Sequence, residues 1–347
     1  MPDARLPNLY ICRTPLQLLN CIEACEHFGL RGGDNVLVCA WRAERDRDLM
    51  RRLLDHYPHW REVHFFPLYP TRHQLPVMLR VFRRHRHFAH LFFGDTTHLI
   101  NLFINKIGSF DSIHLVDDGT ATLHRARQIA ERTLHLQRKN FTARHPAASA
   151  LFAALGLSAT FHYRAGLFTI YDIPQPALRR RVVRNTLAFC KSRIGEKPRS
   201  AEIWFIGSNI RREVLIDAAD YDDFLDQVQR RLDLSKVVYI PHRKEQDDYL
   251  ATISRRYGME IRRLPDILEI ELVNAATIPA AFVSFGSSAV DTIDILVHPP
   301  ITIFRIPESA IEPVRRESVR GMYHSAIEKG FEVVDLQPAG AAADAAG

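Results

Sequence analysis

Short, uniformly apolar segments alternate with segments of helical periodicity along most of the chain. In the first 120 residues the apolar segments predict strands at residues 9–12, 35–39, 63–66, 90–93 and 112–116. Between them, apolar positions at helical spacing predict helices at residues 15–28, 45–54, 75–85 and 98–107. Strands that are apolar throughout are typical of a parallel sheet covered by helices on both faces.

The same alternation returns in the second half of the chain. It predicts strands at residues 202–206, 237–240, 282–285, 301–304 and 331–334, with helices at 221–232, 247–257, 267–275, 288–296 and 314–329. Residues 120–200 do not show this alternation of strand and helix patterns, and we interpret them as helices and a basic connector. The fold class expected is α/β and GT-B-like, with two Rossmann-like domains whose parallel sheets face a central cleft.

The domain limits follow from these patterns. We expect an N-terminal, acceptor-side domain at residues 1–195, which includes the basic connector, and a nucleotide-sugar-binding domain at residues 196–337. The remaining residues, 338–347, are rich in Ala and Gly and predict a disordered tail. Ligands of such domains bind beyond the carboxyl ends of the strands, so the candidate chemistry is sought there.

Composition narrows the class of protein. The chain has 347 residues, of which 46% are hydrophobic and 25% are charged, which excludes fibrous and intrinsically disordered classes. No apolar run reaches the ~20 residues of a membrane-spanning helix, and no secretory signal follows the N-terminus. Five cysteines, an odd number, favour free thiols in a reducing compartment. We therefore expect a cytoplasmic protein.

The net charge of +6 is unevenly distributed. Residues 120–200 contain fifteen Lys or Arg and only three Asp or Glu. Such a segment attracts phosphate groups, anionic lipid or nucleic acid, although a plain solvated surface is an equal alternative. No recognisable nucleic-acid-binding module accompanies the basic residues, so nucleic acid is not expected as a partner. The expectation is peripheral association with the inner membrane surface.

An acidic pair closes the fifth predicted strand. Asp117 and Asp118 are followed by Gly119, and two adjacent carboxylates can raise one another's pKa so that one accepts a proton. A helix cap with a turn is the structural alternative. The acidic stretch with Asp217, Asp220 and Asp222 could supply a rival general base, and no ligand set near it indicates a metal site.

Two further turns could bind an anion. Pro241, His242 and Arg243 follow a predicted strand and precede a helix, as expected of a phosphate clamp. Ser287 and Ser288 open another helix after a strand, where hydroxyl and N–H groups can hold phosphate, although an ordinary helix cap is common there.

Other residues complete the predicted ligand-binding edge. Residues 207–209, which are Gly207, Ser208 and Asn209, would line its floor, and Glu269 could hold a ribose diol if it does not simply face solvent. The chain lacks a Walker A sequence, a G-x-G-x-x-G turn, a G-x-S-x-G elbow and an H-E-x-x-H motif. ATPase, dehydrogenase, serine hydrolase and zinc protease functions thereby lose their main support.

Taken in order, these motifs resemble glycosyltransferase family 52, which includes bacterial lipooligosaccharide sialyltransferases. The opening segment, residues 9–18 (LYICRTPLQL), is similar to the N-terminus of that family. Asp117-Asp118-Gly119 is similar to the acidic-acidic-Gly motif that bacterial sialyltransferases and polysialyltransferases share, and Ser287-Ser288 to their paired serines. His242 stands where they carry a His-Pro motif, but Arg243 follows it in place of proline.

The resemblance implies a specific reaction. It implies a GT-B fold, a CMP-sialic acid donor, inversion at the anomeric carbon, and no metal or other cofactor. The acceptor would be a terminal galactoside of lipooligosaccharide or capsular glycan, either as a free glycan or as a glycolipid. Asp118 or Asp117 would be the base, and His242 with the two serines would hold the departing phosphate. The alternatives are a family-52 transferase of another nucleotide sugar and a nucleic-acid-binding protein. A homodimer is left open.

Overall fold

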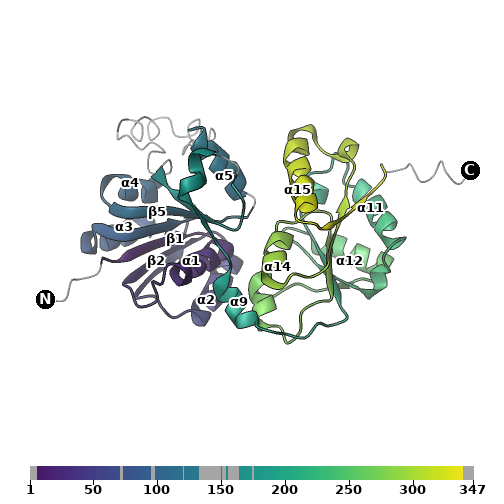
Figure 1. Ribbon diagram of the computed structural model, residues 1–347, viewed down its shortest axis with the longest axis horizontal. Coiled ribbons are helices and arrows are strands. Elements are labelled where there is room, and N and C mark those ends of the chain that lie inside the picture. The colour runs from purple at the N-terminus through teal and green to yellow at the C-terminus, as the bar shows by residue number, and fades with distance from the viewer. Residues whose placement is uncertain are drawn as a thin grey trace, which may run out of the picture. The chain divides into compact units, whose positions relative to one another are not determined.

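The computed structural model describes residues 6–70, 73–94, 98–119, 121–132, 164–173 and 176–338, together with residues 150 and 154. The chain divides into two compact units, Met1–Phe189 (unit 1) and Cys190–Gly347 (unit 2) (Figure 1). Among the helices of the described ranges, none has both the length and the apolar character that a membrane span requires.

Unit 1 contains one parallel sheet. Its strands in the described ranges are β1 (Asn8–Cys12), β2 (Asn35–Trp41), β3 (Glu62–Pro67), β4 (His87–Phe93), β5 (Ser109–Val116), β6 (Gly166–Thr169) and β7 (Val182–Arg184). Their order across the sheet is β3-β2-β1-β4-β5-β6-β7. Strands β2 and β3 thus lie on one side of β1, and β4 to β7 lie on the other side of β1, as in a Rossmann fold.

Helices cover both faces of this sheet (Figure 1). They are α1 (Pro15–His27), α2 (Glu44–His56), α3 (Gln74–Arg84), α4 (His98–Lys106), α5 (Ala121–Ala130), the 3₁₀ helix η2 (Pro176–Arg181) and α9 (Ala188–Ile194) at the division between the units. Apolar side chains of α3, α4 and α5 pack with alternate strand residues such as Ile11, Val38 and Phe93. The helices α1 and α2 contact each other, and α1 also contacts β1.

The local sequence explains where α1 begins. Thr14 precedes it in an extended conformation, and its hydroxyl oxygen accepts a hydrogen bond from the Gln17 N–H at 3.2 Å. Pro15 occupies the first turn, where no intrahelical N–H donor is needed. The helix therefore starts directly beyond the carboxyl end of β1.

Unit 2 repeats the same topology. Its strands are β8 (Ile203–Ile206), β9 (Val237–Ile240), β10 (Glu260–Ile261), β11 (Ala281–Ser284), β12 (Ile301–Arg305) and β13 (Glu332–Asp335), all parallel, in the order β10-β9-β8-β11-β12-β13. The helices are α10 (Ile210–Glu213), α11 (Asp220–Gln229), η3 (Leu234–Lys236), α12 (Asp247–Tyr257), α13 (Leu268–Asn274), α14 (Ala289–Val297), η4 (Glu308–Ala310), η5 (Pro313–Arg315) and α15 (Arg316–Glu328).

An aromatic cluster fills one face of this second sheet. Phe205 on β8 stacks on Tyr239 of β9 with ring centroids 5.3 Å apart, and Tyr221 of α11 packs edge-on against Phe285 at 5.1 Å. These side chains are fully buried. Aromatic pairs of this geometry add ~0.5–1.5 kcal/mol beyond the burial of their area.

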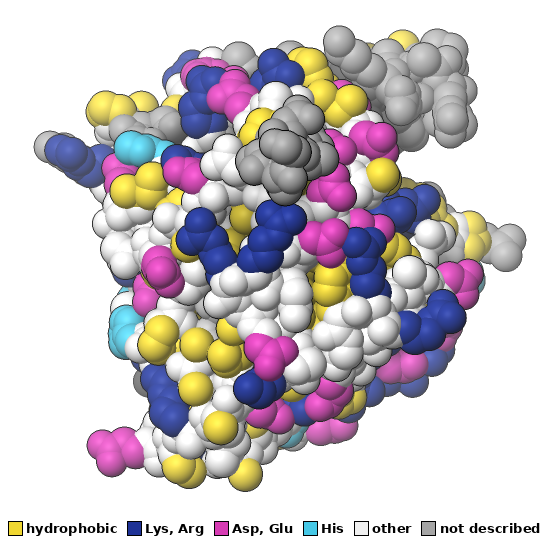
Figure 2. All heavy atoms as spheres, turned by 90° about the vertical axis from the view of Figure 1, so that its right-hand side faces the viewer, with side chains coloured by type: hydrophobic (Ala, Val, Ile, Leu, Met, Phe, Trp, Pro, Cys, Tyr) yellow, Lys and Arg dark blue, Asp and Glu magenta, His cyan; other side chains and the backbone are white. Residues whose placement is uncertain are grey.

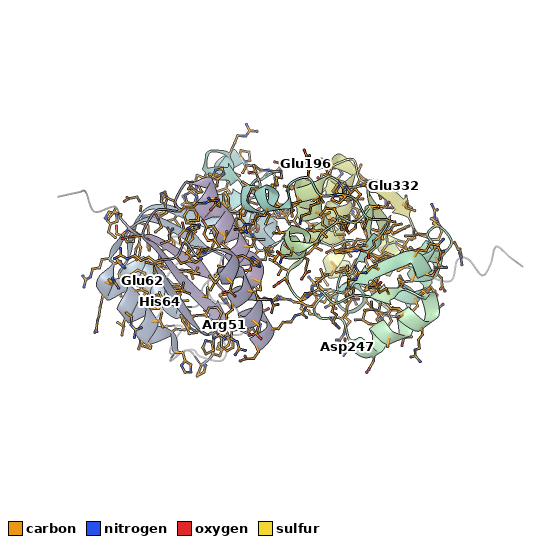
Figure 3. The ribbon with its side chains drawn as sticks, turned by 90° about the horizontal axis from the view of Figure 1, so that it is seen from below. Arg51, Glu62, His64, Glu196, Asp247 and Glu332 are labelled. Carbon is orange, nitrogen blue, oxygen red and sulfur yellow. The ribbon has the colours of Figure 1, made fainter. Side chains whose placement is uncertain are left out.

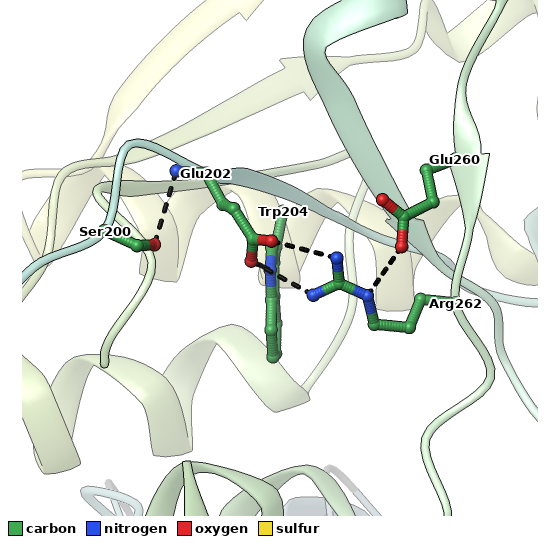
Figure 4. Close-up of polar contacts among 5 residues, drawn as sticks. All are labelled: Ser200, Glu202, Trp204, Glu260 and Arg262. Atoms are coloured by element: carbon green, nitrogen blue, oxygen red, sulfur yellow. Dashed lines mark hydrogen bonds and ion pairs between the residues drawn. The ribbon is translucent and has the colours of Figure 1, made fainter. Parts of the chain in front are cut away.

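On the same sheet an ion-pair cluster joins β8 to β10 across β9 (Figure 4). Arg262 donates to both carboxylate oxygens of Glu202 at 2.9 and 3.0 Å and to Glu260 at 2.8 Å. The indole N–H of Trp204 donates to Glu202 at 2.8 Å. The bidentate geometry fixes the edge strand β10, which is only two residues long.

The structure confirms the predicted α/β class with two Rossmann-like parallel sheets, and most predicted elements start or end within three residues of the observed ones. It corrects the interpretation of the basic connector, because β6 and β7 lie within it and complete the first sheet. Both strands are short, and η2 with its arginine run comes directly before β7, which hides the strand pattern. The short strand β10 was also missed. The predicted tail lies outside the described residues from 339 onward.

Candidate functional site

Three turns lie side by side at the carboxyl edge of the sheet in unit 2. They follow the neighbouring strands β9, β8 and β11, and they contain residues 241–243, 207–209 and 285–288. Between β8 and β11 the order of the strands reverses. Such a switch point leaves an opening between two turns and is where Rossmann-like folds bind ligands. The structure therefore brings together the three segments that the sequence singled out in this unit.

The turn after β9 is anchored by a half-buried carboxyl group. Glu245 accepts a hydrogen bond from the His242 backbone N–H at 2.6 Å and one from the Tyr239 hydroxyl at 2.7 Å. Burial raises the pKa of Glu245, while these two donors oppose the rise. A Cβ at Gly207 would lie 2.6 Å from a Glu245 oxygen and 2.9 Å from the Ile240 carbonyl oxygen. Only glycine fits there, so the turns after β8 and β9 are locked together.

His242 is half-buried, and its ring is oriented by the backbone. The Lys244 N–H donates to His242 Nδ1 at 3.3 Å, which places the proton of a neutral ring on Nε2. Burial lowers the pKa of His242, and the positive charges of Arg243 and Lys244 lower it further. At neutral pH the ring is thus a neutral Nε2–H donor, which suits a hydrogen bond to an anionic oxygen.

The turn after β11 contains the paired serines. Ser284 donates to the Ile206 carbonyl oxygen at 2.9 Å and accepts from the Gly286 N–H at 3.0 Å, which ties this turn to β8. Gly286 has φ +142°, a region that favours glycine, and Met322 of α15 lies against it. Ser287 and Ser288 follow and are half-buried. Ser287 accepts the Ala289 N–H at 3.3 Å, whereas Ser288 makes no capping hydrogen bond to α14.

Glu269 lies against the first turn of α14 and does not face solvent. Its side chain is 6% exposed, and it accepts a hydrogen bond from the Thr292 hydroxyl at 2.9 Å. Burial raises its pKa. The carboxyl group is near the paired serines, because Thr292 also donates to the carbonyl oxygen of Ala289, the residue after Ser288. A role in holding a ribose stays a prediction.

The remaining candidates of this edge differ in exposure. Ser208 and Asn209 are half-buried, and Ser208 Oγ is buried with no hydrogen-bond partner among the described residues. Arg243 is exposed at the rim, and Lys244 beside it pairs with Glu213 at 2.6 Å. Within the described ranges, no three His, Cys, Asp or Glu side chains form a set that could hold a metal ion.

In unit 1 the acidic pair follows β5, and its two carboxyl groups have different surroundings. Asp117 is 3% exposed, and one of its oxygens accepts the Ile170 N–H at 2.7 Å, which joins β5 to the end of β6. Burial raises the pKa of Asp117 from 3.8 to about 6, although hydrogen bonds from Thr169, Ile170 and Thr122 oppose the rise. Its Oδ1 is buried without a hydrogen-bond partner in the described part of the chain.

Asp118 is the accessible member of the pair. Its side chain is 27% exposed, and its Oδ2 lies 3.9 Å from the Arg125 guanidinium. The Thr122 hydroxyl accepts the Asp118 backbone N–H at 2.9 Å, and Gly119 then turns the chain with φ +66° into α5. A carboxylate that is exposed and rigidly placed can accept a proton from a bound hydroxyl group, whereas Asp117 has no such access.

A buried polar network behind the acidic pair was missed by the sequence analysis. Asn20 of α1 donates to the Asp117 carbonyl oxygen at 3.3 Å and accepts from the Asn185 side chain at 2.9 Å. Glu23, one turn further along α1, accepts the Phe189 N–H at 2.9 Å. All these side chains are at most 3% exposed. Asn20 and Asn185 are 165 residues apart in the sequence, so no local signal could have revealed the contact.

The rival acidic stretch lies at the start of α11. Asp222 accepts the Tyr249 hydroxyl at 2.6 Å, and Asp217 caps the turn by accepting the Ala219 N–H at 2.8 Å. The Asp220 carboxylate has no hydrogen-bond donor among the described residues, and burial together with the charges of Asp217 and Asp223 raises its pKa. Asp220 thus stays available as an alternative base.

No protein-family model matches the chain, and no curated protein does either. Solved structures similar to it include a UDP-GlcNAc 2-epimerase from Neisseria meningitidis bound to UDP-GlcNAc, with 10% identity, coverage of 93% of this chain and 91% of that one, and a TM-score of 0.49. The E. coli heptosyltransferase WaaC with ADP has 9% identity, 93% and 99% coverage and a TM-score of 0.47. MurG of Acinetobacter baumannii has 9% identity, 96% and 88% coverage and a TM-score of 0.44.

These proteins are similar to the chain over most of its length. Two parallel α/β units are what the structure itself contains.

Proposed function

We propose that the chain is an inverting, metal-independent sialyltransferase of the family-52 type. It would transfer sialic acid from CMP-sialic acid to a terminal galactoside of lipooligosaccharide or capsular glycan. The observation that carries the proposal is the convergence of residues 207–209, His242 and Ser287-Ser288 on three neighbouring strands of one sheet. In unit 2 the sequence resemblance rests on His242 and on Ser287-Ser288, and residues 207–209 lie between them at the edge where a nucleotide is expected.

The donor site follows from the chemistry of these turns. A phosphate diester at the switch point would accept hydrogen bonds from His242 Nε2–H, from the serine hydroxyls and from Ser208, whose Oγ has no hydrogen-bond partner among the described residues. The guanidinium of Arg243 at the rim adds positive charge. Neutral donors are sufficient to hold a monoanionic phosphate, and they gain strength as negative charge develops on the leaving group.

The transfer step assigns one role to each unit. The carboxylate of Asp118 accepts the proton of an acceptor hydroxyl, and the oxygen attacks the anomeric carbon of the donor as the bond to the CMP oxygen breaks. CMP leaves with the bonding electrons, and the His242 and serine donors stabilise its negative charge. Inversion follows from a single displacement. Asp117 positions Asp118 by holding the turn against β6.

A binding experiment separates the donor classes. Titration calorimetry with CMP, UDP and GDP should give binding to CMP alone among the three, and product analysis with CMP-sialic acid and a panel of galactosides should identify the acceptor. Activity that survives EDTA would support the absence of a metal requirement. Selective binding of UDP or GDP would instead favour a family-52 transferase of another sugar. Retention on heparin without any nucleotide binding would favour nucleic acid.

Cytoplasmic location and a homodimer stay predictions beside this proposal. The basic segment that led to the expected membrane association lies partly outside the described residues, between residues 133 and 163. Its described part includes Arg125, which interacts with Asp118, and Arg181, whose pKa is lowered by burial. These two arginines are used within unit 1, and membrane association through the rest of the basic segment stays a prediction.

A further inference from the structure

The outer side of α3 carries positive charge without acidic neighbours in sequence. Between Glu62 and Asp95 the chain contains five arginines and no Asp or Glu. Three of them, Arg80, Arg83 and Arg84, are exposed on α3 and line an open surface hollow of about 560 Å³ together with Pro76 and Leu79. We call the residues that line this hollow (Pro76, Leu79, Arg80, Arg83 and Arg84) the α3 basic strip.

Most of this charge is not neutralised within the protein. Arg84 pairs with Glu62 at 2.9 Å, and Glu62 lies beside His64 on β3 (Figure 3). Arg80 and Arg83, by contrast, make no hydrogen bond or ion pair with any residue of the described ranges. The helix α2 is different, because Arg47 there pairs with both Glu44 and Asp48.

Exposed apolar side chains lie next to the strip in the sequence, near the start of α3. Leu75 is 45% exposed, and Tyr69, shortly before the helix, is 65% exposed. The opposite side of α3 is firmly packed, since Met78, Val81 and Phe82 are buried. The helix therefore has a packed inner face and an outer face that carries the arginines, with exposed apolar side chains near its first turn. On the face of unit 2 in Figure 2, by contrast, basic and acidic side chains are interspersed.

We propose that the α3 basic strip is a docking surface for an anionic lipid bilayer. Arginines at the headgroup level attract anionic lipid, while Leu75 and Tyr69 enter the boundary of the acyl chains. Exposed aliphatic groups among the arginines favour a bilayer over nucleic acid, since phosphate contacts alone would not use them. The inference is independent of the donor chemistry, because the strip lies in unit 1 and the donor site in unit 2.

The test uses the full chain and two matched double variants. R80S/R83S removes two exposed charges from the strip, and R230S/R231S removes two exposed charges from the end of α11 in unit 2. Cosedimentation with vesicles of phosphatidylcholine and phosphatidylglycerol should show about thirty-fold weaker partitioning for R80S/R83S, as expected for ~1 kcal/mol per basic residue. R230S/R231S should bind like the unaltered protein, and vesicles of phosphatidylcholine alone should bind neither.

A second variant separates lipid from other anions. Leu75→Ser keeps the charge, and it should weaken vesicle binding about threefold while leaving binding to a single-stranded RNA oligonucleotide unchanged. Equal losses in both arginine pairs, or no vesicle binding at all, would overturn the proposal. RNA binding that depends on Arg80 and Arg83, without vesicle binding, would assign the strip to nucleic acid instead. Unchanged melting temperatures identify each variant as folded, independently of the proposed activity.

Discussion

The carboxyl edges of the two sheets have the same topology but use their polar groups differently. In unit 1 the polar side chains behind the edge, such as Asn20, Asp117 and Asn185, are buried and hydrogen-bonded to one another or to backbone groups. In unit 2 the corresponding turns present half-buried side chains, His242 and Ser288 among them, whose polar atoms are not all used internally. The carboxyl edge in unit 1 is therefore held by internal hydrogen bonds, whereas the edge in unit 2 has polar groups that are available to a ligand.

The two carboxyl groups of the acidic pair in unit 1 differ in the same way. A buried carboxyl group that holds the chain cannot also exchange a proton with a bound substrate, so the rigid edge exposes only Asp118. At the other edge, rigidity comes from Glu245 and Ser284 beneath the turns. His242 and Ser288 in these turns therefore keep polar atoms that the proposed phosphate could contact.

The largest effect is expected from the exposed acid. Asp118→Asn should lower turnover by about 10²–10⁴-fold, because general-base assistance is lost, and should leave CMP affinity nearly unchanged. Steady-state kinetics with saturating donor and calorimetry with CMP measure the two quantities. Asp220→Asn is the matched control at the rival acidic stretch. If Asp220→Asn loses activity and Asp118→Asn keeps it, the base belongs to α11.

The buried acid should influence stability through pH. Its pKa is raised from 3.8 to about 6, so between these values the folded state holds a proton that the unfolded chain has released. Stability contributed by this proton falls as the pH rises from about 4 to about 6, by a total of about 3 kcal/mol. Urea unfolding of Asp117→Asn should lack this decline, and Asp118→Asn should keep it. Parallel pH profiles for the unaltered protein and Asp117→Asn would contradict the raised pKa.

His242 tests the second edge. His242→Ala should weaken CMP binding by about 1.5–3 kcal/mol, since a hydrogen bond to a charged group is lost, and should also lower turnover. Because the pKa of His242 is lowered, CMP affinity should not depend on its protonation between pH 7 and pH 8. A variant that loses turnover while binding CMP normally would mean that His242 is not at the phosphate.

The paired serines should give a smaller loss at the same edge. Ser288→Ala should weaken CMP binding by about 1 kcal/mol, because its hydroxyl makes no capping hydrogen bond to α14 and can be used by the ligand. Glu269→Gln is the companion variant, since its carboxyl group lies beside the same turn but already accepts from Thr292. Unchanged calorimetric affinity for CMP in both variants would place the nucleotide away from β11.

The sequence could predict most strands of both sheets because buried parallel strands are apolar throughout, as in residues 35–39 and 237–240. The sequence also located the turns that follow these strands, because polar residues come directly after each apolar run. It could not show that β6 and β7 complete the first sheet, because strands of three or four residues carry little pattern. The sequence also could not show that Asp117 is buried and Asp118 is accessible. The surroundings of Asp117 come from Ile170 and Asn20, which are far away in the chain.

The smallest effect is expected away from both carboxyl edges, at the Arg262 cluster of Figure 4. Arg262 and Glu202 are about one-third exposed, so solvent screens their pairing and Arg262→Met should cost only about 0.5–1 kcal/mol of unfolding free energy. Arg262 lowers the pKa of Glu202, so this contribution is present at neutral pH and is lost as the pH falls through the lowered pKa. Urea unfolding at neutral and acidic pH measures it. CMP affinity should not change, because the cluster contacts none of the three turns that form the proposed donor site.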